Sequence, residues 1–364
     1  MKENNQVENT FLEINNDSFK QVSLHEVDEV SITILMDNFI DFLLTNSEHA
    51  VRPSLIEDEK IRLLPPPIAE HGFSALIRIG KYAHSQRKQN EIKQDGSNKH
   101  SVDNIFLFDT GISENGIIHN AKVFGVNISE IDGIILSHGH FDHFTGLVNV
   151  LQEILRSGTT SGIDLFLHPD SFLKRWEVFP NGKKAKMPFL DENKLKKVGA
   201  IIHKDKDPVY LPNKNSPSIL LTGQIPRETN FEKGFPFQYI IDSMNDCLIP
   251  DPLVKDDQAL IINVKDKGLV ILTGCGHAGI INTINYGKKL TGIEKIYAIL
   301  GGFHLPADNG IYEDAIEPTL KELQKANPDY IIPCHCTGWK AINKIIDVMP
   351  GKFIQSSVGT IFTF

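Results

Sequence analysis

The sequence contains few cysteines, little excess charge and no long hydrophobic run, and each absence limits what the chain can be. Only four cysteines occur in 364 residues, and Cys334 and Cys336 are separated by one residue, so a disulfide framework is not expected. The net charge is −9, with 37 Lys and Arg against 46 Asp and Glu. This balance argues against a broad basic surface and against a nucleic-acid partner. A local basic pocket for a small anion stays open.

The apolar stretch at residues 31–44 does not predict a membrane span. It contains Asp37, Asn38 and Asp41, and it is too short and too polar to cross a bilayer. Residues 1–20 lack a basic segment leading into an apolar one, so no secretory signal is expected. We therefore expect a cytoplasmic protein without a membrane partner, and the oligomeric state stays open.

Short apolar segments and amphipathic segments predict an α/β protein with one large domain. Early strands in close succession, followed by strand–helix alternation, indicate two sheets with helices outside. Residues 84–104 are rich in Gln, Lys, Asn and Ser and predict an exposed loop insertion. We expect residues 1–28 to form a peripheral N-terminal segment and residues 29–364 to form the domain. Strands are predicted over 31–36, 74–79, 105–108, 133–136, 164–167, 219–222, 259–264, 269–273, 296–300 and 330–332, and helices over 145–155, 278–290, 315–326 and 339–349.

The strongest chemical signal is a run of ligand-type side chains directly after the predicted strand at 133–136. His138, His140, Asp142 and His143 lie within six residues. In an extended segment, His138 and His140 point to the same side, while Asp142 and His143 face a second point from the turn into the next helix. Imidazole and carboxylate together suit zinc, iron or manganese, and a pair of such ions can hold a bridging hydroxide. We predict a metal site here, because unconnected surface histidines rarely follow this pattern.

This run resembles the H-x-H-x-D-H signature of the metallo-β-lactamase superfamily. The resemblance covers most of the chain from residue 30 onward, and it narrows to a branch similar to the 7,8-dihydropterin-6-methyl-4-(β-D-ribofuranosyl)aminobenzene-5'-phosphate synthase of the methanopterin pathway. The narrower match rests on Met36-Asp37-Asn38, Ala69-Glu70-His71-Gly72-Phe73-Ser74, Asp109-Thr110-Gly111, Thr222-Gly223-Gln224-Ile225-Pro226-Arg227, Asp256-Asp257-Gln258-Ala259-Leu260, Thr273-Gly274-Cys275-Gly276-His277-Ala278-Gly279, Gly301-Gly302-Phe303-His304-Leu305 and Pro333-Cys334-His335-Cys336-Thr337-Gly338.

The resemblance implies an αββα sandwich with metals at one sheet edge. It implies two divalent transition-metal ions, with zinc as the first choice and iron or manganese as alternatives. A last C-terminal histidine completes the second metal in the superfamily, and His335 is the candidate here. C-x-C as half of a zinc knuckle is disfavoured, because no second cysteine pair exists.

Two departures from the superfamily pattern concern the remaining ligands. The superfamily commonly has Thr-Gly-Asp where this chain has Thr-Gly-Cys275. Many members also carry a metal histidine around the segment that reads Thr222-Gly223-Gln224 here, which has no histidine. Either Cys275 ligates as a thiolate, or it is a small buried residue while His277 binds; we favour His277. His138, His140 and His277 would then hold the first ion, and Asp142, His143 and His335 the second.

Other polar residues receive roles with open alternatives. Asp109 follows a predicted strand, where it can hydrogen-bond a ligand histidine or satisfy turn amides. His304 is assigned to substrate binding or proton transfer, with an ordinary loop histidine as the alternative. Arg227, Lys340 and the turn that begins at Ser356 and Ser357 are candidates for binding phosphate oxygens, although the turn can equally be an ordinary one.

Three functions are compatible with these patterns. Taken literally, the resemblance implies a transferase that joins a dihydropterin diphosphate to a ribosyl-aminobenzene phosphate, with Asp142 and His304 as catalytic residues. The alternative is a hydrolase of a phosphoester, thioester or lactone that uses a metal-bound hydroxide. A metal-binding sensor without catalysis is the third, and the intact His138–His143 motif argues against it. In the first two cases we expect an anionic small-molecule substrate, which a metal pair can attract despite the acidic surface.

Overall fold

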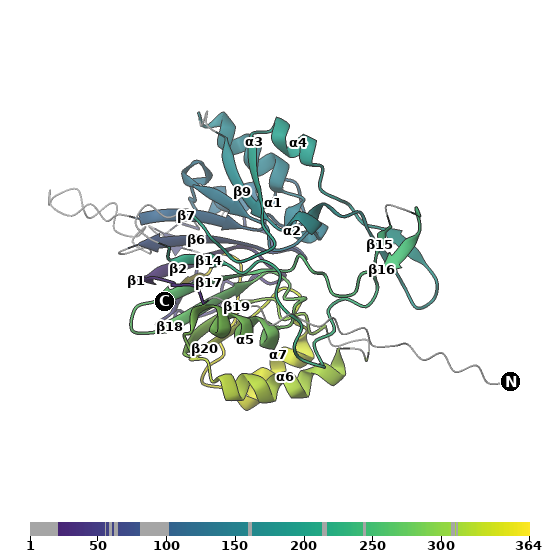
Figure 1. The fold of residues 1–364 in the computed structure, drawn as a ribbon. Helices are drawn as coiled ribbons and strands as arrows, with labels where there is room; N and C mark the ends of the chain where they lie inside the picture. Colours follow the sequence, from purple (N-terminus) through teal and green to yellow (C-terminus); the bar gives the residue numbers. More distant parts are fainter. Residues whose placement is uncertain are drawn as a thin grey trace.

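The chain folds into four layers, with two β-sheets face to face and helices on both outer sides (Figure 1). The computed structural model describes residues 21–54, 56–57, 60–61, 65–80, 102–158, 162–212, 217–242, 245–306, 310 and 312–364. This arrangement is the αββα sandwich that the resemblance implies. No described helix has the length and hydropathy needed to cross a membrane.

The first sheet has eight strands and contains the His-rich motif at its edge. Its order is β12-β9-β8-β7-β6-β2-β21-β3, with β7, β8, β9 and β12 parallel to one another. β2 reads VSITILM and is buried along its whole length, as expected for a strand covered on both faces. The strands are β2 (Val30–Met36), β3 (Ala50–Val51), β6 (Ser74–Gly80), β7 (Val102–Phe108), β8 (Gly133–Ile135), β9 (Ile163–Leu167), β12 (Ala200–Lys204) and β21 (Ile361–Thr363).

The second sheet has seven strands in the order β13-β14-β17-β18-β19-β20, with β1 paired to β17. β18, β19 and β20 are parallel, so their carboxyl ends meet at one edge. Its strands are β1 (Glu26–Val27), β13 (Val209–Tyr210), β14 (Ile219–Leu221), β17 (Ala259–Val264), β18 (Gly268–Thr273), β19 (Ile296–Gly301) and β20 (Tyr330–Pro333).

The helices divide between the two sheets (Figure 1). One outer layer covers the eight-stranded sheet and the other covers the seven-stranded sheet. The layer on the eight-stranded sheet comprises α1 (Gly116–Val123), the short α2 (Phe141–Phe144), α3 (Leu147–Arg156) and α4 (Glu192–Lys197), with 3₁₀ turns at Ile128–Glu130 and Pro169–Phe172. The layer on the seven-stranded sheet comprises α5 (Ile280–Thr291), α6 (Glu313–Ala326) and α7 (Trp339–Val348).

Three apolar clusters fill the spaces between the four layers. The central one joins the facing sides of both sheets, with Ile32, Phe108 and Leu272 among its members. A second packs α5, α6 and α7 against the seven-stranded sheet, and a third packs α1 and α3 against the eight-stranded sheet. The two sheets therefore form one continuous core, and this fixes the loops at their shared edge.

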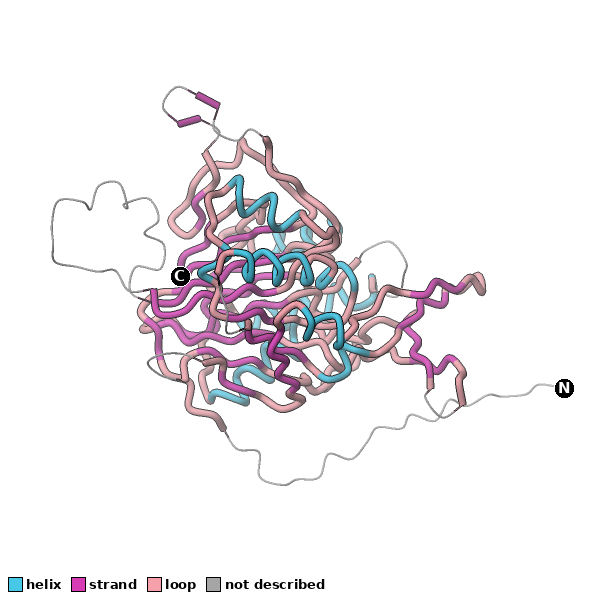
Figure 2. Tube along the Cα trace, turned by 90° about the horizontal axis from the view of Figure 1, so that it is seen from above, coloured by secondary structure: helices cyan, strands magenta, loops and turns pink. Residues whose placement is uncertain are grey.

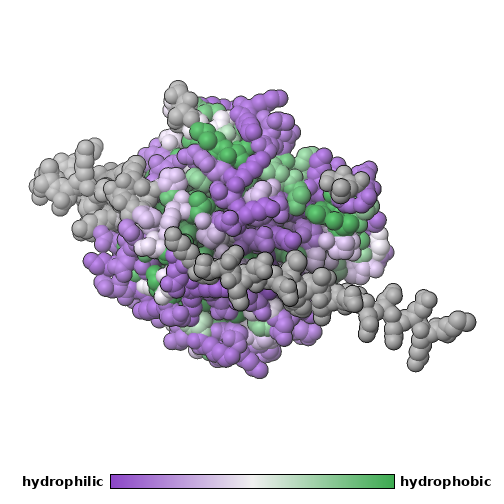
Figure 3. Space-filling model, in the orientation of Figure 1, coloured by the Kyte–Doolittle hydropathy of each residue, from purple (hydrophilic) through white to green (hydrophobic). Residues whose placement is uncertain are grey.

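A small antiparallel sheet projects from one side of the body (Figure 2). Its order is β11-β10-β15-β16, and a separate two-stranded hairpin is formed by β4 (Ile56–Glu57) and β5 (Lys60–Ile61). The face seen in Figure 3 is mainly hydrophilic with smaller hydrophobic areas, and Phe179, Phe189 and Ile249 are exposed in this part of the chain. The strands of the small sheet are β10 (Arg175–Val178), β11 (Lys184–Lys186), β15 (Gln238–Ile241) and β16 (Leu248–Pro250).

The structure corrects one predicted boundary and adds detail to another. The predicted loop at 84–104 ends earlier, because residues 102–104 belong to β7 and pair with β6; the rest of that loop lies outside the described residues. In the predicted N-terminal segment, residues 1–20 also lie outside them, whereas β1 pairs with β17 and Leu24 is buried in the core. The domain boundary at residue 29 stays a prediction.

Candidate metal centre

The ligand-type side chains lie at one edge of the two facing sheets, most of them in loops and Asp142 and His143 in the short helix α2. His138 follows β8, Cys275 and His277 follow β18, and His335 follows β20. These loops meet because the carboxyl ends of parallel strands share an edge. His335 has a left-handed backbone with φ of 51°, a strained conformation that tends to occur where a side chain must be held in one direction.

Three imidazoles converge in what we call the trihistidine group: His138, His140 and His277. Nδ1 of His140 lies 3.0 Å from Nε2 of His138 and 3.1 Å from Nε2 of His277. Nitrogens around a tetrahedral zinc ion lie about 3.3 Å apart, so these three atoms fit one ion. The segment Thr222-Gly223-Gln224 has no histidine, and His277 supplies the third imidazole of this cluster.

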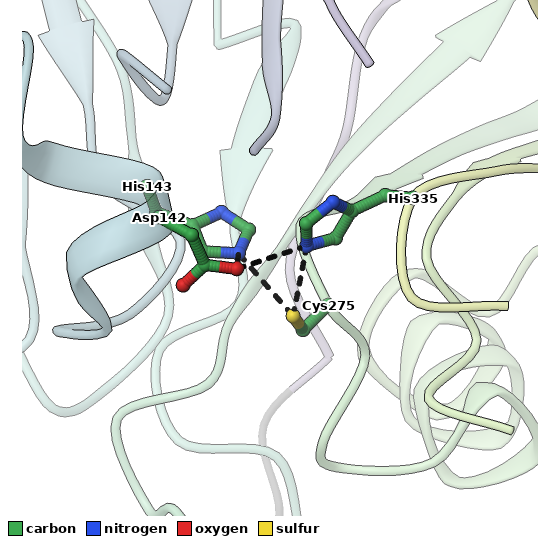
Figure 4. Close-up of side chains that lie close together, drawn as sticks. All are labelled: Asp142, His143, Cys275 and His335. Carbon is green, nitrogen blue, oxygen red and sulfur yellow. Dashed lines mark hydrogen bonds and ion pairs between the residues drawn. The ribbon is translucent and has the colours of Figure 1, made fainter. Parts of the chain in front are cut away.

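Four side chains form a second cluster, the mixed group of Asp142, His143, Cys275 and His335 (Figure 4). The Cys275 sulfur lies 3.2 Å from Nε2 of His143 and 3.2 Å from Nε2 of His335. Oδ2 of Asp142 lies 3.5 Å and 3.3 Å from the same two nitrogens. One carboxylate, one thiol and two imidazoles therefore face a common point.

Cys275 belongs to both clusters. Its sulfur also lies within 4.8 Å of ligand nitrogens of His138 and His277. From the sequence, either Cys275 or His277 could be the metal ligand. The structure places both side chains at the centre, with the Cys275 thiol between the two groups. Imidazole, carboxylate and thiolate are the donors of transition-metal sites, so this set fits divalent ions.

Asp109 fixes the histidines of both groups through hydrogen bonds. Its Oδ2 accepts from Nδ1 of His143 at 2.7 Å and from the Ser137 hydroxyl at 2.7 Å. Ser137 Oγ lies 3.0 Å from Nδ1 of His138. Because these contacts engage the outer nitrogens, the Nε2 atoms of His138 and His143 are left to face the centre.

Gln238 from β15 orients the ring of His140 through a hydrogen bond, as Asp109 does for His143. Its Oε1 lies 2.5 Å from Nε2 of His140, while its own amide nitrogen donates to Oδ2 of Asp251 at 2.9 Å. The amide orientation is thereby fixed, so His140 donates from Nε2 and presents the lone pair of Nδ1. The small sheet therefore contributes directly to the centre.

The protonation of the two groups differs. Burial, reinforced by Arg175, lowers the pKa of His140 to about 4, and burial also places the pKa of His138 and His277 well below the ordinary histidine value. For His143, burial acts in the same direction, but the carboxylates of Asp142 and Asp109 outweigh it and raise the pKa to about 9.

A buried ion pair supports the turn of the H-x-H motif. Arg175 donates to Oδ1 of Asp256 at 2.6 Å, and Oδ2 of Asp256 accepts from the main-chain nitrogen of Gly139 at 2.7 Å. A Cβ at Gly139 would lie 2.3 Å from the carbonyl oxygen of Ser171, so only glycine fits this close approach. The sequence singled out Asp256 only as part of the family resemblance and gave Arg175 no role.

Asp37 holds the main chain of His335. Its Oδ1 accepts from the His335 nitrogen at 3.0 Å, and its Oδ2 accepts from the Ser356 hydroxyl at 2.7 Å. Asn38 donates to the His335 carbonyl oxygen at 2.6 Å. Ser356 is fully buried, and its hydroxyl is engaged in supporting the loop of His335.

The remaining candidates for phosphate binding are also engaged in internal contacts. Arg227 donates to the main-chain carbonyls of Ile225 and Leu253, Lys340 pairs with Glu313 on the surface, and Ser357 accepts from the main-chain nitrogen of Asp41. These contacts do not reach the ligand side chains of the centre, and phosphate binding by Arg227, Lys340 and Ser357 stays a prediction.

His304 lies beside the trihistidine group at a small cavity. Its ring centroid is 3.9 Å from that of His277. The cavity is partly open to solvent and is lined by Glu232, Gly276, His277, Phe303, His304 and Tyr312 among others. Burial raises the pKa of Glu232 to about 7, despite the main-chain amides of Ile281 and Asn282 that it accepts from.

Comparisons with known proteins identify the family of this chain. The family model of the metallo-beta-lactamase superfamily matches residues 101–213. The 7,8-dihydropterin-6-methyl-4-(beta-D-ribofuranosyl)-aminobenzene-5'-phosphate synthase of Methanocaldococcus jannaschii is 34% identical over 301 residues, which are 81% of this chain and 90% of that protein. An uncharacterized protein of the same organism is 33% identical over 293 residues, 80% of this chain and 93% of its own length.

A solved structure gives the same result for the fold. Tm1679, a metal-dependent hydrolase of the beta-lactamase superfamily, superposes with a TM-score of 0.63 at 21% identity, covering 92% of this chain and 98% of its own. The predicted αββα sandwich is confirmed. With a relative above 30% identity across four fifths of the sequence, the chain belongs to the metallo-β-lactamase superfamily, in the branch of the dihydropterin–ribofuranosylaminobenzene phosphate synthase.

Proposed function

We propose that this chain is a metal-dependent transferase that acts on a diphosphorylated small molecule, in the manner of the synthase to which it is similar. The observation that carries the proposal is the pair of donor groups on either side of Cys275, combined with 34% identity to that synthase over 81% of the chain. Two adjacent divalent ions are suited to a diphosphate because they bind phosphoryl oxygens and offset the charge of the leaving group.

Each group would hold one divalent ion, with zinc as the first choice. His138, His140 and His277 would hold one ion, and Asp142, His143 and His335 the other, with the thiolate of Cys275 between them. Asp109 and Gln238 keep the ring nitrogens aimed inward. The loops around the centre exclude water, since His138 and His143 have no exposed surface.

Among the predicted catalytic residues, we assign Asp142 to metal binding first. Its Oδ2 faces His143 and His335, and their positive charge outweighs the effect of burial and lowers the pKa of Asp142. It is therefore ionised and suited to a ligand. His304, at the wall of the cavity beside His277, is placed to contact a substrate that enters there.

The test is a product assay on zinc-reconstituted protein. The expected result is condensation of a dihydropterin diphosphate with a ribosyl-aminobenzene phosphate, accompanied by release of diphosphate. Generic phosphodiesters and lactones are assayed in parallel. Turnover of these alone would move the protein to the hydrolase alternative, and no turnover of any substrate would overturn an enzymatic function.

Two variants make the assay specific for the centre. His138→Ala removes one imidazole of the trihistidine group and should abolish condensation together with one equivalent of bound zinc. His25→Ala is the matched control, because His25 is exposed in the N-terminal segment ahead of β1. Equal activity of both variants would show that the reaction does not use this centre.

A further inference from the structure

A third set of soft donor atoms lies next to the two groups described above. The sulfur of Cys275, the imidazole of His304 and the sulfur of Cys336 lie within 4.8 Å of one another. His304 follows β19 and Cys336 follows β20, so this set is built from the same sheet edge. Neither His304 nor Cys336 belongs to the trihistidine group or to the mixed group.

His304 is held in a way that leaves one ring nitrogen without a partner. Its Nε2 lies 3.1 Å from the Tyr312 hydroxyl, whereas its Nδ1 is buried and has no hydrogen-bond partner among the described residues. The backbone of His304 has φ of 42°, which is unfavourable for a residue other than glycine. An unpaired buried nitrogen and a strained backbone both cost free energy, and both are explained if the ring is positioned for a ligand.

We propose that Cys275, His304 and Cys336 form a third cation site, which takes a soft divalent ion such as zinc. Two thiolates and one imidazole are a donor set that favours zinc over magnesium or calcium. The fourth position is left to water or to an incoming group. The site does not depend on the reaction proposed above, although it shares Cys275 with both groups.

The position of this third site suggests what it does. His304 lines the small cavity, and both His304 and Cys336 are partly exposed, whereas the ligands of the other two groups are buried. The third site is therefore the outermost of the three, and its ion can pass to the buried groups by exchanging ligands around the shared sulfur of Cys275. It is an entry point for metal loading.

Binding at this site has a defined proton balance. The Cys336 thiol donates to the main-chain oxygen of Cys275 at 2.9 Å. When Cys275 is already a ligand of the mixed group, an ion that binds here replaces only the proton of Cys336; when this site is occupied first, the protons of both thiols leave to solvent. In either case the hydrogen bond from Cys336 to the Cys275 oxygen is lost. No oxidant or reductant takes part.

The experiment is a cobalt(II) titration of the metal-free full-length protein, followed by thiolate-to-cobalt charge-transfer absorption. Cys336→Ser should lower the saturating stoichiometry by one equivalent and reduce the charge-transfer absorption, because the third ion and its thiolate bonds are lost. His304→Gln should also lose one equivalent. Cys247→Ser is the matched control, because Cys247 is exposed, and it should match the wild type.

An unchanged stoichiometry and an unchanged spectrum for Cys336→Ser would overturn the proposal. If Cys336→Ser still binds two equivalents of cobalt, the variant is folded and the trihistidine and mixed groups are intact. Failure of the third site can therefore be distinguished from failure of the proposed function.

Wild-type protein provides a second measurement in case the variants do not fold. Alkylation of Cys336, followed by mass spectrometry, should slow at least tenfold between two and three equivalents of zinc, while alkylation of Cys247 stays constant. An equal rate of Cys336 alkylation at both loadings would contradict a third site.

Discussion

The trihistidine group and the mixed group differ in how many protons they hold before a metal ion binds. The pKa values of His138, His140 and His277 all lie below the ordinary histidine value because the rings are buried. In the mixed group, His143 has its pKa raised to about 9 by two carboxylates, and burial raises the pKa of the Cys275 thiol well above its usual range. At neutral pH, one group is ready for a cation and the other must first release protons.

Because of this difference, the trihistidine group and the mixed group can bind their metal ions one after the other, even though both lie next to the Cys275 sulfur. The neutral trihistidine group binds a divalent ion without competition from protons, so it should fill first. The sign for His143 follows from its raised pKa: its protonated form stabilises the metal-free fold below about pH 6.5, and this contribution is lost as the pH rises through about 9. Metal affinity of the mixed group should therefore rise with pH through about 9, and the raised pKa of the Cys275 thiol extends this rise to higher pH.

The largest expected effect comes from removing the shared sulfur. Cys275→Ala takes one ligand from the mixed group and a close neighbour from the trihistidine group. Zinc affinity of the mixed group should fall by more than about 100-fold, beyond the effect of losing an outer hydrogen-bond partner, and affinity of the trihistidine group should fall less. Competition with a chromophoric chelator measures both, with Cys247→Ala as control. Equal affinities for the variant and the wild type would exclude Cys275 as a ligand.

Removing a ligand from only one group separates the two sites. His140→Ala should abolish binding at the trihistidine group and leave one equivalent at the mixed group, whose atoms do not include this ring. Metal analysis after gel filtration gives the remaining stoichiometry. Loss of both equivalents in a folded variant would mean that the two groups do not bind independently.

Removing a residue that hydrogen-bonds to a ligand histidine should also weaken metal binding mainly at one of the two groups, with a smaller loss of affinity than removing the ligand itself. Gln238→Ala removes the partner of His140 and should weaken the trihistidine group by about 10–100-fold. Asp109→Asn removes a carboxylate that touches His143 directly and His138 only through Ser137, so it should weaken mainly the mixed group. Chelator competition at each site checks the pattern, and the opposite ranking would refute these assignments.

The smallest effect is expected at the support of His335. Ser356→Ala leaves Oδ2 of Asp37 without its buried donor, which costs about 1–3 kcal/mol of unfolding free energy. Metal affinity should change less than tenfold, because Oδ1 still holds the main chain of His335. Urea denaturation of the variant and of the wild type measures the change in unfolding free energy. Equal stability of the variant and the wild type would remove Ser356 from this network.

The fold could be predicted wherever strands are buried on both faces. β2, β17 and β19 are runs of apolar residues because they lie between a sheet and a helix layer. The strands of the small sheet were not predicted, because they are short and partly exposed, as the RWEV of β10 shows. The short α1 was missed for a related reason, since its GIIHNAKV includes only two helical turns of mixed polarity.

The centre was predictable where its residues are neighbours in the sequence or directly follow a predicted strand. The His138–His143 motif carries its own spacing signal, and strand ends indicated Cys275, His277 and His335. Gln238 is 98 residues from the ring that it contacts, and Asp37 is 298 residues from His335. Such pairs leave no local pattern, because only the packing of the two sheets brings them together.

The central claim is that two adjacent groups bind metal with different proton release. The direct measurement is a calorimetric titration of metal-free protein with zinc at pH 7.5, up to two equivalents, in two buffers of different ionisation enthalpy. The first equivalent should release almost no protons from the trihistidine group, and the second should release about two, from His143 and Cys275. A single binding event, or equal proton release for both equivalents, would contradict the account.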